Sequence, residues 1–284
     1  MVPLVMSIIS ILISMLWAGS VIGLTVLSSA QPPPLPGGTS LSLFTIQIFN
    51  YIFFTFFSYY VMVFLIASSA AIWYYQSRKS MLGSGIKWLF QAHIGSITFG
   101  ALIITIIKMM QMMAKGQKSS NVVTQIFRAI CICLLAQIER FVKVMNRFAV
   151  IIMSFTGEDF VTSCKSTGII IFKNLGVFSI ITIVSNFFYY SGLLLCTGIP
   201  TTIAGIVVSN IDIKDPTMPI LLVFFSSLLI TNIFLATFTE TLTSVFVFYS
   251  LDLQLQEYGI NIVNVPSDMQ LLLEHAFDDS EDYR

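Results

Sequence analysis

The chain has 284 residues, of which 56% are hydrophobic and 10% charged, and its mean hydropathy is +0.88. Soluble domains carry about 25% charged residues, so this composition excludes an ordinary soluble protein and predicts an integral membrane protein. The 14 basic and 14 acidic residues give zero net charge, but they are unevenly distributed. The first 77 residues contain no charged residue, and eight of the acidic residues lie among the last 33 residues. Such an asymmetry can set the orientation of a chain in a membrane.

Several other function classes leave no signature in the sequence. The basic residues are spread thinly between apolar runs and form no patch for a nucleic acid. The four cysteines and two histidines lack the spacing of a zinc site, and the sequence has no phosphate loop, nucleophile elbow or metalloprotease motif. We therefore expect no enzyme, no metal, no cofactor and no nucleic-acid partner.

Six apolar stretches predict membrane-spanning helices, because crossing about 30 Å of hydrocarbon takes about 20 residues. They are residues 4–27, 43–75, 93–114, 121–138, 174–198 and 218–250. The fourth stretch is short and contains Arg128, whereas the second is longer than a crossing needs and must tilt, kink or protrude. Gly192, Gly198 and Pro200 suggest that the fifth helix breaks and re-enters. The expected fold is thus an all-α, polytopic membrane protein.

The positions of the basic residues favour six spans with both termini in the cytosol. In that topology the inner segments carry eight Lys or Arg residues and the outer loops three, in agreement with the positive-inside rule. Without the span at 121–138, the basic block that follows would lie outside. We therefore predict a membrane domain over residues 1–250 and an acidic cytosolic tail over residues 251–284.

Residues 139–173 form a long block between predicted spans. Glu139, Lys143 and Arg147 recur at every fourth residue, so a helix would place them on one face, with apolar residues on the other. This pattern predicts an interfacial amphipathic helix. Residues 160–172 are too few to span and predict a re-entrant or membrane-surface helix.

Short motifs in a fixed order resemble the choline transporter-like family. Trp73-Tyr74-Tyr75 precedes a pattern similar to the family's H-x-G-S-x-x-x-G, and two later segments resemble E-K-F-x-K-x-x-N-R-N-A-Y and G-x-x-F-C-T-S-A-[KR]. The departures from these two patterns are Phe148, Val150, Val161 and Cys164. Residues 246–252 resemble the end of the family's last span. The residues that match are His93, Gly95, Ser96, Gly100, Glu139, Lys143, Asn146, Arg147, Phe160, Ser163 and Lys165.

The resemblance implies a transporter of choline or a related organic cation, in the plasma membrane or in an intracellular membrane. Family members are longer, and this chain resembles their C-terminal half. Two alternatives therefore stay open: a non-transporting membrane subunit or scaffold, and a truncated half-transporter. The expected partners are the organic cation and the lipid bilayer, with a second membrane subunit or a homo-oligomer as further possibilities.

Glu240 is the only acid within the predicted spans, and a carboxylate inside a membrane is costly unless it has a role. It is a candidate counter-charge for a cation, or a proton site. A structural glutamate, protonated or paired with Lys108, is the alternative. The resemblance places the family's own acid at Thr243, three residues later.

Aromatic residues are the other candidates, because each ring can attract a quaternary ammonium by about 1–2 kcal/mol when water is excluded. Tyr59 and Tyr60 lie in the middle of a predicted span, whereas Trp73-Tyr74-Tyr75 is expected to form an interface belt. His93 starts a span, where it is either a hydrated interfacial residue or a site of proton coupling. Gly95, Ser96 and Gly100 predict close helix packing.

Overall fold

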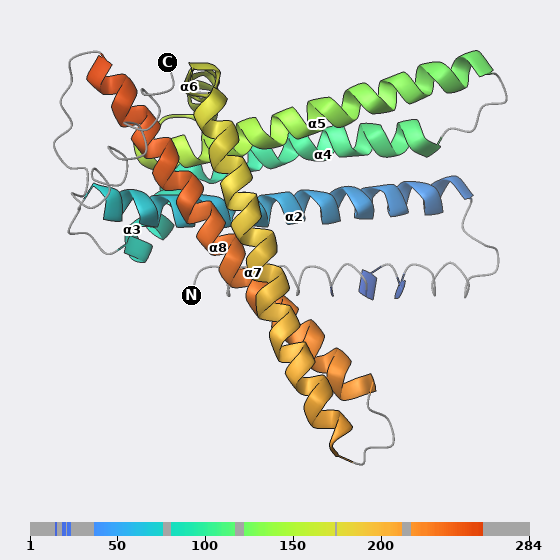
Figure 1. Cartoon of the computed structure of the whole chain (residues 1–284). Coiled ribbons are helices and arrows are strands. Elements are labelled where there is room, and N and C mark those ends of the chain that lie inside the picture. Colours follow the sequence, from blue (N-terminus) through green and yellow to red (C-terminus); the bar gives the residue numbers. More distant parts are fainter. Residues whose placement is uncertain are drawn as a thin grey trace. The chain divides into compact units, whose positions relative to one another are not determined.

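A computed structural model describes residues 37–75, 81–116, 122–173, 175–211 and 217–257, together with a few single residues before them. Within these ranges the chain is helical and contains no strand (Figure 1). The expected all-α fold is therefore confirmed. Most of the predicted span 4–27 and the tail after residue 257 lie outside the described residues.

Seven α-helices and one π-helical turn make up the described elements. They are α2 (Gly37–Tyr74), α3 (Met81–Trp88), the π-turn η1 (Leu89–His93), α4 (Ile94–Gly116), α5 (Val122–Thr156), α6 (Phe160–Lys173), α7 (Leu175–Ser209) and α8 (Thr217–Glu257). Within the part of the chain that the structure describes, four helical segments are long and apolar enough to cross a bilayer. These are Phe44–Tyr74, Gly83–Gly116, Thr182–Ser209 and Thr217–Asp252, and each overlaps a predicted span.

The structure differs from the expectation over residues 121–173. Where we predicted a span followed by a separate interfacial helix, α5 is one continuous helix of 35 residues. Within the described residues it is not among the four candidate spans, and Arg128 and the charged residues from Glu139 onward lie along it. A crossing by residues 121–138 therefore stays a prediction.

The helix α7 also departs from the prediction, because it continues through Pro200 to Ser209 without a break. A proline inside a helix leaves carbonyl groups of the preceding turn without their usual donor. Threonine hydroxyls supply donors in this region: Thr201 donates to the carbonyl of Thr197 at 2.7 Å, and Thr202 to that of Gly198 at 3.0 Å. The carbonyl that Pro200 leaves without a donor is that of Cys196, so these hydroxyls add bonds beside the proline and do not replace the missing one.

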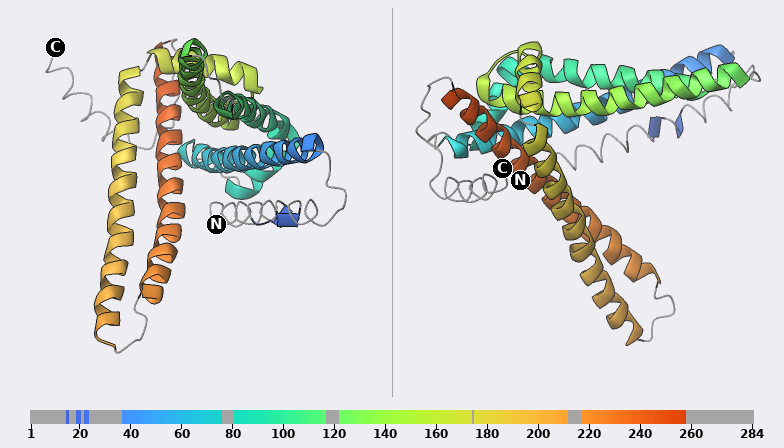
Figure 2. Two further views of the ribbon diagram at one scale, coloured as in Figure 1. Left: turned by 90° about the vertical axis from the view of Figure 1, so that its right-hand side faces the viewer. Right: turned by 45° about the horizontal axis from the view of Figure 1, so that its top comes forward.

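The chain divides into two compact units, of which the first comprises residues 1–64 and 89–168. In this unit α4 and α5 pack side by side and run in opposite directions (Figure 2). The turn to α6 begins at Gly157, which adopts a positive φ of 73° and whose N–H bonds to the carbonyl of Met153. Asp159 then caps α6 by accepting the backbone N–H of Thr162. Residues 157–159 therefore form the turn between α5 and α6.

The second unit comprises residues 65–88 and 169–284, and its largest feature is the pair α7 and α8. A Cβ on Gly192 would lie 3.0 Å from the Leu235 side chain, so these two helices approach closely here and a larger residue would require Leu235 to shift. Close by, the Tyr189 hydroxyl donates to Asn232 Oδ1 at 2.7 Å. Large apolar side chains cover the outer surface of the pair, as a lipid-facing helix pair requires.

Candidate functional site

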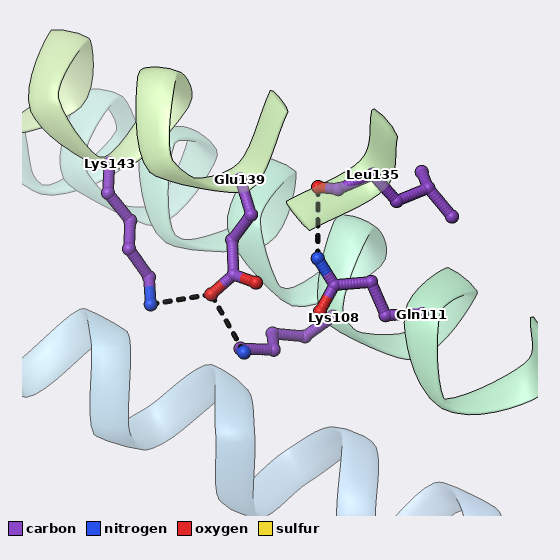
Figure 3. Close-up of polar contacts among 5 residues, drawn as sticks. All are labelled: Lys108, Gln111, Leu135, Glu139 and Lys143. Atoms are coloured by element: carbon purple, nitrogen blue, oxygen red, sulfur yellow. Dashed lines mark hydrogen bonds and ion pairs between the residues drawn. The ribbon is translucent and has the colours of Figure 1, made fainter. Parts of the chain in front are cut away.

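A buried carboxylate with two lysine partners lies between α4 and α5 (Figure 3). Glu139 is 7% exposed, and its Oε1 lies 2.8 Å from Lys108 Nζ and 2.6 Å from Lys143 Nζ. The contact with Lys143 is the one that the four-residue spacing predicts. The contact with Lys108 joins two helices, and the sequence had suggested Glu240 as the partner of this lysine instead.

Two further side chains complete this cluster, which we call the Glu139 cluster. The Lys143 ammonium lies 5.1 Å from the centre of the Phe56 ring on α2, within the range of a cation–π contact. Gln111 donates to the carbonyl of Leu135 at 2.9 Å and also hydrogen-bonds Glu139. The cluster therefore consists of Phe56, Lys108, Gln111, Glu139 and Lys143, from three helices.

The environment of Glu139 keeps this carboxyl ionised. Burial alone would raise its pKa, but hydrogen bonds from Lys108, Lys143 and Gln111 outweigh the burial and lower the pKa to about 2. A carboxyl whose pKa is lowered by folding contributes stability above its unfolded pKa, and that contribution is lost as the pH falls toward the folded pKa.

We expect the folded chain to lose stability as the pH is lowered from about 4.5, the ordinary glutamate value, toward about 2. Thermal unfolding in detergent at a series of pH values measures this loss. The other carboxyl groups titrate over a similar range, so the contribution of Glu139 is the difference between the native chain and Glu139→Gln. An equal pH dependence of the two proteins would contradict the expectation.

A second cluster of motif residues, which we call the Asn146 cluster, lies further along the same helices. Asn146 Nδ2 donates to the carbonyl of Gly100 at 2.9 Å, and the Asn146 side chain also hydrogen-bonds Tyr60. A Cβ on Gly100 would lie 3.0 Å from the ring of Phe160, which packs edge-on against Phe99 at 5.7 Å between ring centres. Motif residues far apart in the sequence thus meet around one glycine.

The remaining motif residues have different environments. Ser163 is fully buried, and its hydroxyl has no hydrogen-bond partner among the described residues. Lys165 is exposed, and Arg147 and Ser96 are partly exposed. A Cβ on Gly95 would meet nothing within 4 Å, so close packing is confirmed at Gly100 but is wrong for Gly95.

The predicted transport residues are divided between the two units. In the first unit Tyr60 is 1% exposed, whereas Tyr59 is partly exposed. His93 is 4% exposed and its ring lies 5.4 Å from that of Phe64, so a hydrated interfacial histidine is wrong. Glu240 and Thr243 lie on α8 in the second unit, and both are 6% exposed.

One polar cluster was missed by the sequence analysis. The hydroxyl groups of Tyr74 and Tyr75 donate to the two oxygens of Asp252 at 3.0 Å and 2.9 Å. Asp252 is 2% exposed and part of α8, although it was assigned to the acidic tail. Of the expected interface belt, only Trp73 is clearly exposed, at 51%. The family motifs at 73–75 and 246–252 were the available signals, but nothing in either motif predicted that they meet.

Apolar helices long enough to cross a bilayer, with buried charges between them, define a polytopic α-helical membrane protein. Residues 1–254 match the family described as plasma-membrane choline transporter, and the chain belongs to this family. It is a multi-pass membrane protein, and its family is one of transporters rather than enzymes. The resemblance seen in the sequence is confirmed.

The chain is similar to several curated relatives. It is 26% identical over 204 residues to choline transporter-like 2 of Anopheles gambiae and 26% identical over 209 residues to choline transporter-like protein 5-B of Danio rerio. These alignments cover 67% and 66% of this chain, but only 26% and 30% of the relatives. The matched part is therefore less than a third of each relative, a smaller share than the half expected from the sequence.

Proposed function

We propose that this chain transports choline or a related organic cation across the plasma membrane, alone or as part of a larger assembly. The observation that carries the proposal is the family match over residues 1–254. The names of the relatives, which refer to choline transport, support the choice of substrate. The lipid bilayer is the other partner that the four candidate spans require.

The chemistry of the buried side chains supports a cationic substrate. In the Glu139 cluster, an ammonium group lies between a carboxylate and an aromatic ring, which is the combination that an organic cation needs. Tyr59, Tyr60 and His93 are candidates for lining the pathway in the same unit. In the other unit, we propose Glu240 as a charge partner for the substrate, with Thr243 close to it on α8.

Uptake by the purified chain tests the proposal. Proteoliposomes that contain only this protein are expected to accumulate radiolabelled choline faster than empty vesicles of the same lipid. Excess unlabelled choline should compete with this uptake, which distinguishes a saturable pathway from a leak. Uptake equal to that of empty vesicles, with protein that is folded by its circular dichroism spectrum, would overturn the proposal for the chain alone.

Glu240→Gln is expected to reduce choline uptake by tenfold or more, because it removes a buried negative charge while keeping the shape of the side chain. Thr239→Val is the matched control. It lies beside Glu240, and its hydroxyl has no hydrogen-bond partner among the described residues, so its loss should leave uptake unchanged. Equal uptake by Glu240→Gln and the native chain would remove this residue from the proposed pathway.

A second candidate function is that of a non-transporting membrane subunit or scaffold. It is favoured by the coverage, since the matched part is less than a third of each relative. This function predicts a stable complex with a second membrane protein or a second copy of the chain, and no uptake by the chain alone. Cross-linking in native membranes followed by mass spectrometry separates the two candidates.

A further inference from the structure

A buried carboxylate in the last turns of α8 contacts the end of α2, and neither the Glu139 cluster nor Glu240 involves it. Each oxygen of Asp252 accepts one tyrosine hydroxyl, from Tyr74 at 3.0 Å and from Tyr75 at 2.9 Å. Asp252 is 2% exposed and Tyr74 is 0% exposed. The group is therefore held in a fixed position and shielded from solvent within the second unit.

Three aromatic rings adjoin one another at this carboxylate. The ring centres of Tyr74 and Tyr75 are 4.9 Å apart, and that of Phe248 lies 6.0 Å from Tyr74 and 6.3 Å from Tyr75. Phe248 is four residues before Asp252 on α8, so the helix places both side chains on the same face. One carboxylate and three rings thus form a compact group from two helices.

The Asp252 carboxylate has no cationic partner among the residues that the structure describes. Both hydrogen-bond donors to Asp252 are neutral, and within the described ranges no lysine or arginine makes an ion pair with it. A buried carboxylate without a cation is unfavourable, because hydrogen bonds replace only part of the lost hydration. A cation beside the carboxylate would therefore stabilise this group.

The surroundings select the kind of cation. Aromatic faces attract an ammonium group that carries methyl substituents, because its charge is spread over an apolar surface that the rings can cover. A small metal ion prefers several oxygen ligands, and this group offers the two oxygens of one carboxylate and two hydroxyl oxygens. The combination of one carboxylate and three rings therefore favours an organic ammonium.

The position of the group fits an end of a transport pathway. Tyr74 is the last residue of α2, and Asp252 lies five residues before the end of α8 at Glu257. In the topology predicted from the basic residues, α2 and α8 both end on the cytosolic side, so we place the group toward that side. We infer that Asp252, Tyr74, Tyr75 and Phe248 form a binding site for an organic ammonium ion. Its assignment to the cytosolic end of the pathway rests on the proposed function.

Direct binding to the full chain tests this site. Purified protein in lipid nanodiscs is titrated with radiolabelled tetramethylammonium, which has the ammonium head of choline without its hydroxyl. Asp252→Asn is expected to weaken binding by about tenfold or more, equivalent to about 1.4 kcal/mol. Asp252→Glu, which keeps the charge, should bind within a few-fold of the native chain. Asp159→Asn is the matched control, since Asp159 lies in an exposed turn of the first unit.

Variants of Tyr74 separate a cation site from a purely structural contact. Tyr74→Phe keeps the ring and removes the hydroxyl, so ammonium binding should persist. Tyr74→Leu removes the ring as well, and binding should weaken by several-fold. If the tyrosine acts only as a hydrogen-bond donor to Asp252, both variants should lower the melting temperature by the same amount. The two variants should then also bind tetramethylammonium with the same affinity.

Three results would overturn the inference. One is the absence of saturable tetramethylammonium binding by the native chain at millimolar concentration, and another is equal affinity of the native chain and Asp252→Asn. The third concerns a variant in which Arg78 and Lys79 are both neutralised. If this variant binds tetramethylammonium more tightly than the native chain, and the gain disappears in Asp252→Asn, then these two residues are the cations that balance the carboxylate. Choline uptake is measured separately, so binding that depends on Asp252 without any uptake refutes the proposed function and leaves the site standing.

Discussion

Glu139→Gln is expected to destabilise the protein by about 1–3 kcal/mol, which lies between the values for exposed and fully buried ion pairs. Glu139 is 7% exposed, but the side chains of Lys108 and Lys143 are 32% and 40% exposed. Water therefore screens the ion pairs in part, and their removal costs less than that of a fully buried pair. The variant leaves two ammonium groups near each other without the negative charge that both contact. Thermal unfolding in detergent at neutral pH measures the effect as a lower melting temperature.

A double-mutant cycle isolates the ion pair from other effects of the glutamine. In a Lys143→Met background, Glu139→Gln should cost less than in the native chain, because one of the two partners is already absent. An equal cost in both backgrounds would show that Lys143 gains nothing from the carboxylate. A native melting temperature for Glu139→Gln would contradict the expectation as a whole.

Gly100→Leu is expected to have a still larger effect, of about 3 kcal/mol or more, because overpacking here displaces both a ring and a hydrogen bond. Its Cβ would lie 3.0 Å from Cε2 and 3.3 Å from Cζ of Phe160, and 3.6 Å from Nδ2 of Asn146. The rest of the leucine side chain needs space that these residues occupy. We expect loss of folded protein in size-exclusion chromatography, or a strongly lowered melting temperature.

Gly95→Leu is the control for Gly100→Leu, since both glycines lie on α4 and a Cβ on Gly95 would meet nothing within 4 Å. Leucine favours a helix more than glycine does, so this change should be neutral or stabilising by up to about 1 kcal/mol. Similar losses for the two variants would show that helix α4 as a whole, rather than the contact with Phe160, sets the requirement for glycine.

The spanning helices could be predicted from the sequence because the signal is local. An apolar run of about 20 residues needs a bilayer wherever it occurs, so α2, α4, α7 and α8 were found without any knowledge of their neighbours. The continuity of α5 was missed because a change from apolar to charged residues also marks the end of a span. The continuity of α7 at Pro200 was not predicted because proline usually ends a helix, whereas helices in membrane proteins tolerate an internal proline.

The partners of each residue could be predicted only within a helix. The contact of Glu139 with Lys143 follows from their spacing, whereas the contacts of Lys108 with Glu139 and of Gly100 with Asn146 depend on how α4 is aligned against α5. Helices that are apolar on every side give no periodic signal for the face that packs. For the same reason the meeting of Tyr74 with Asp252, which are 178 residues apart, could not be found.

The shared oxygen of Glu139 makes the cluster tolerant of some changes and intolerant of others. Because one carboxylate serves two ammonium groups, losing either lysine leaves a neutral pair, whereas losing the glutamate leaves two positive charges. The two lysines are thus partly redundant and the glutamate is not. Among sequences that diverge from this one, substitutions should accumulate at position 108 or at position 143 singly, and the acidic residue at 139 should outlast both.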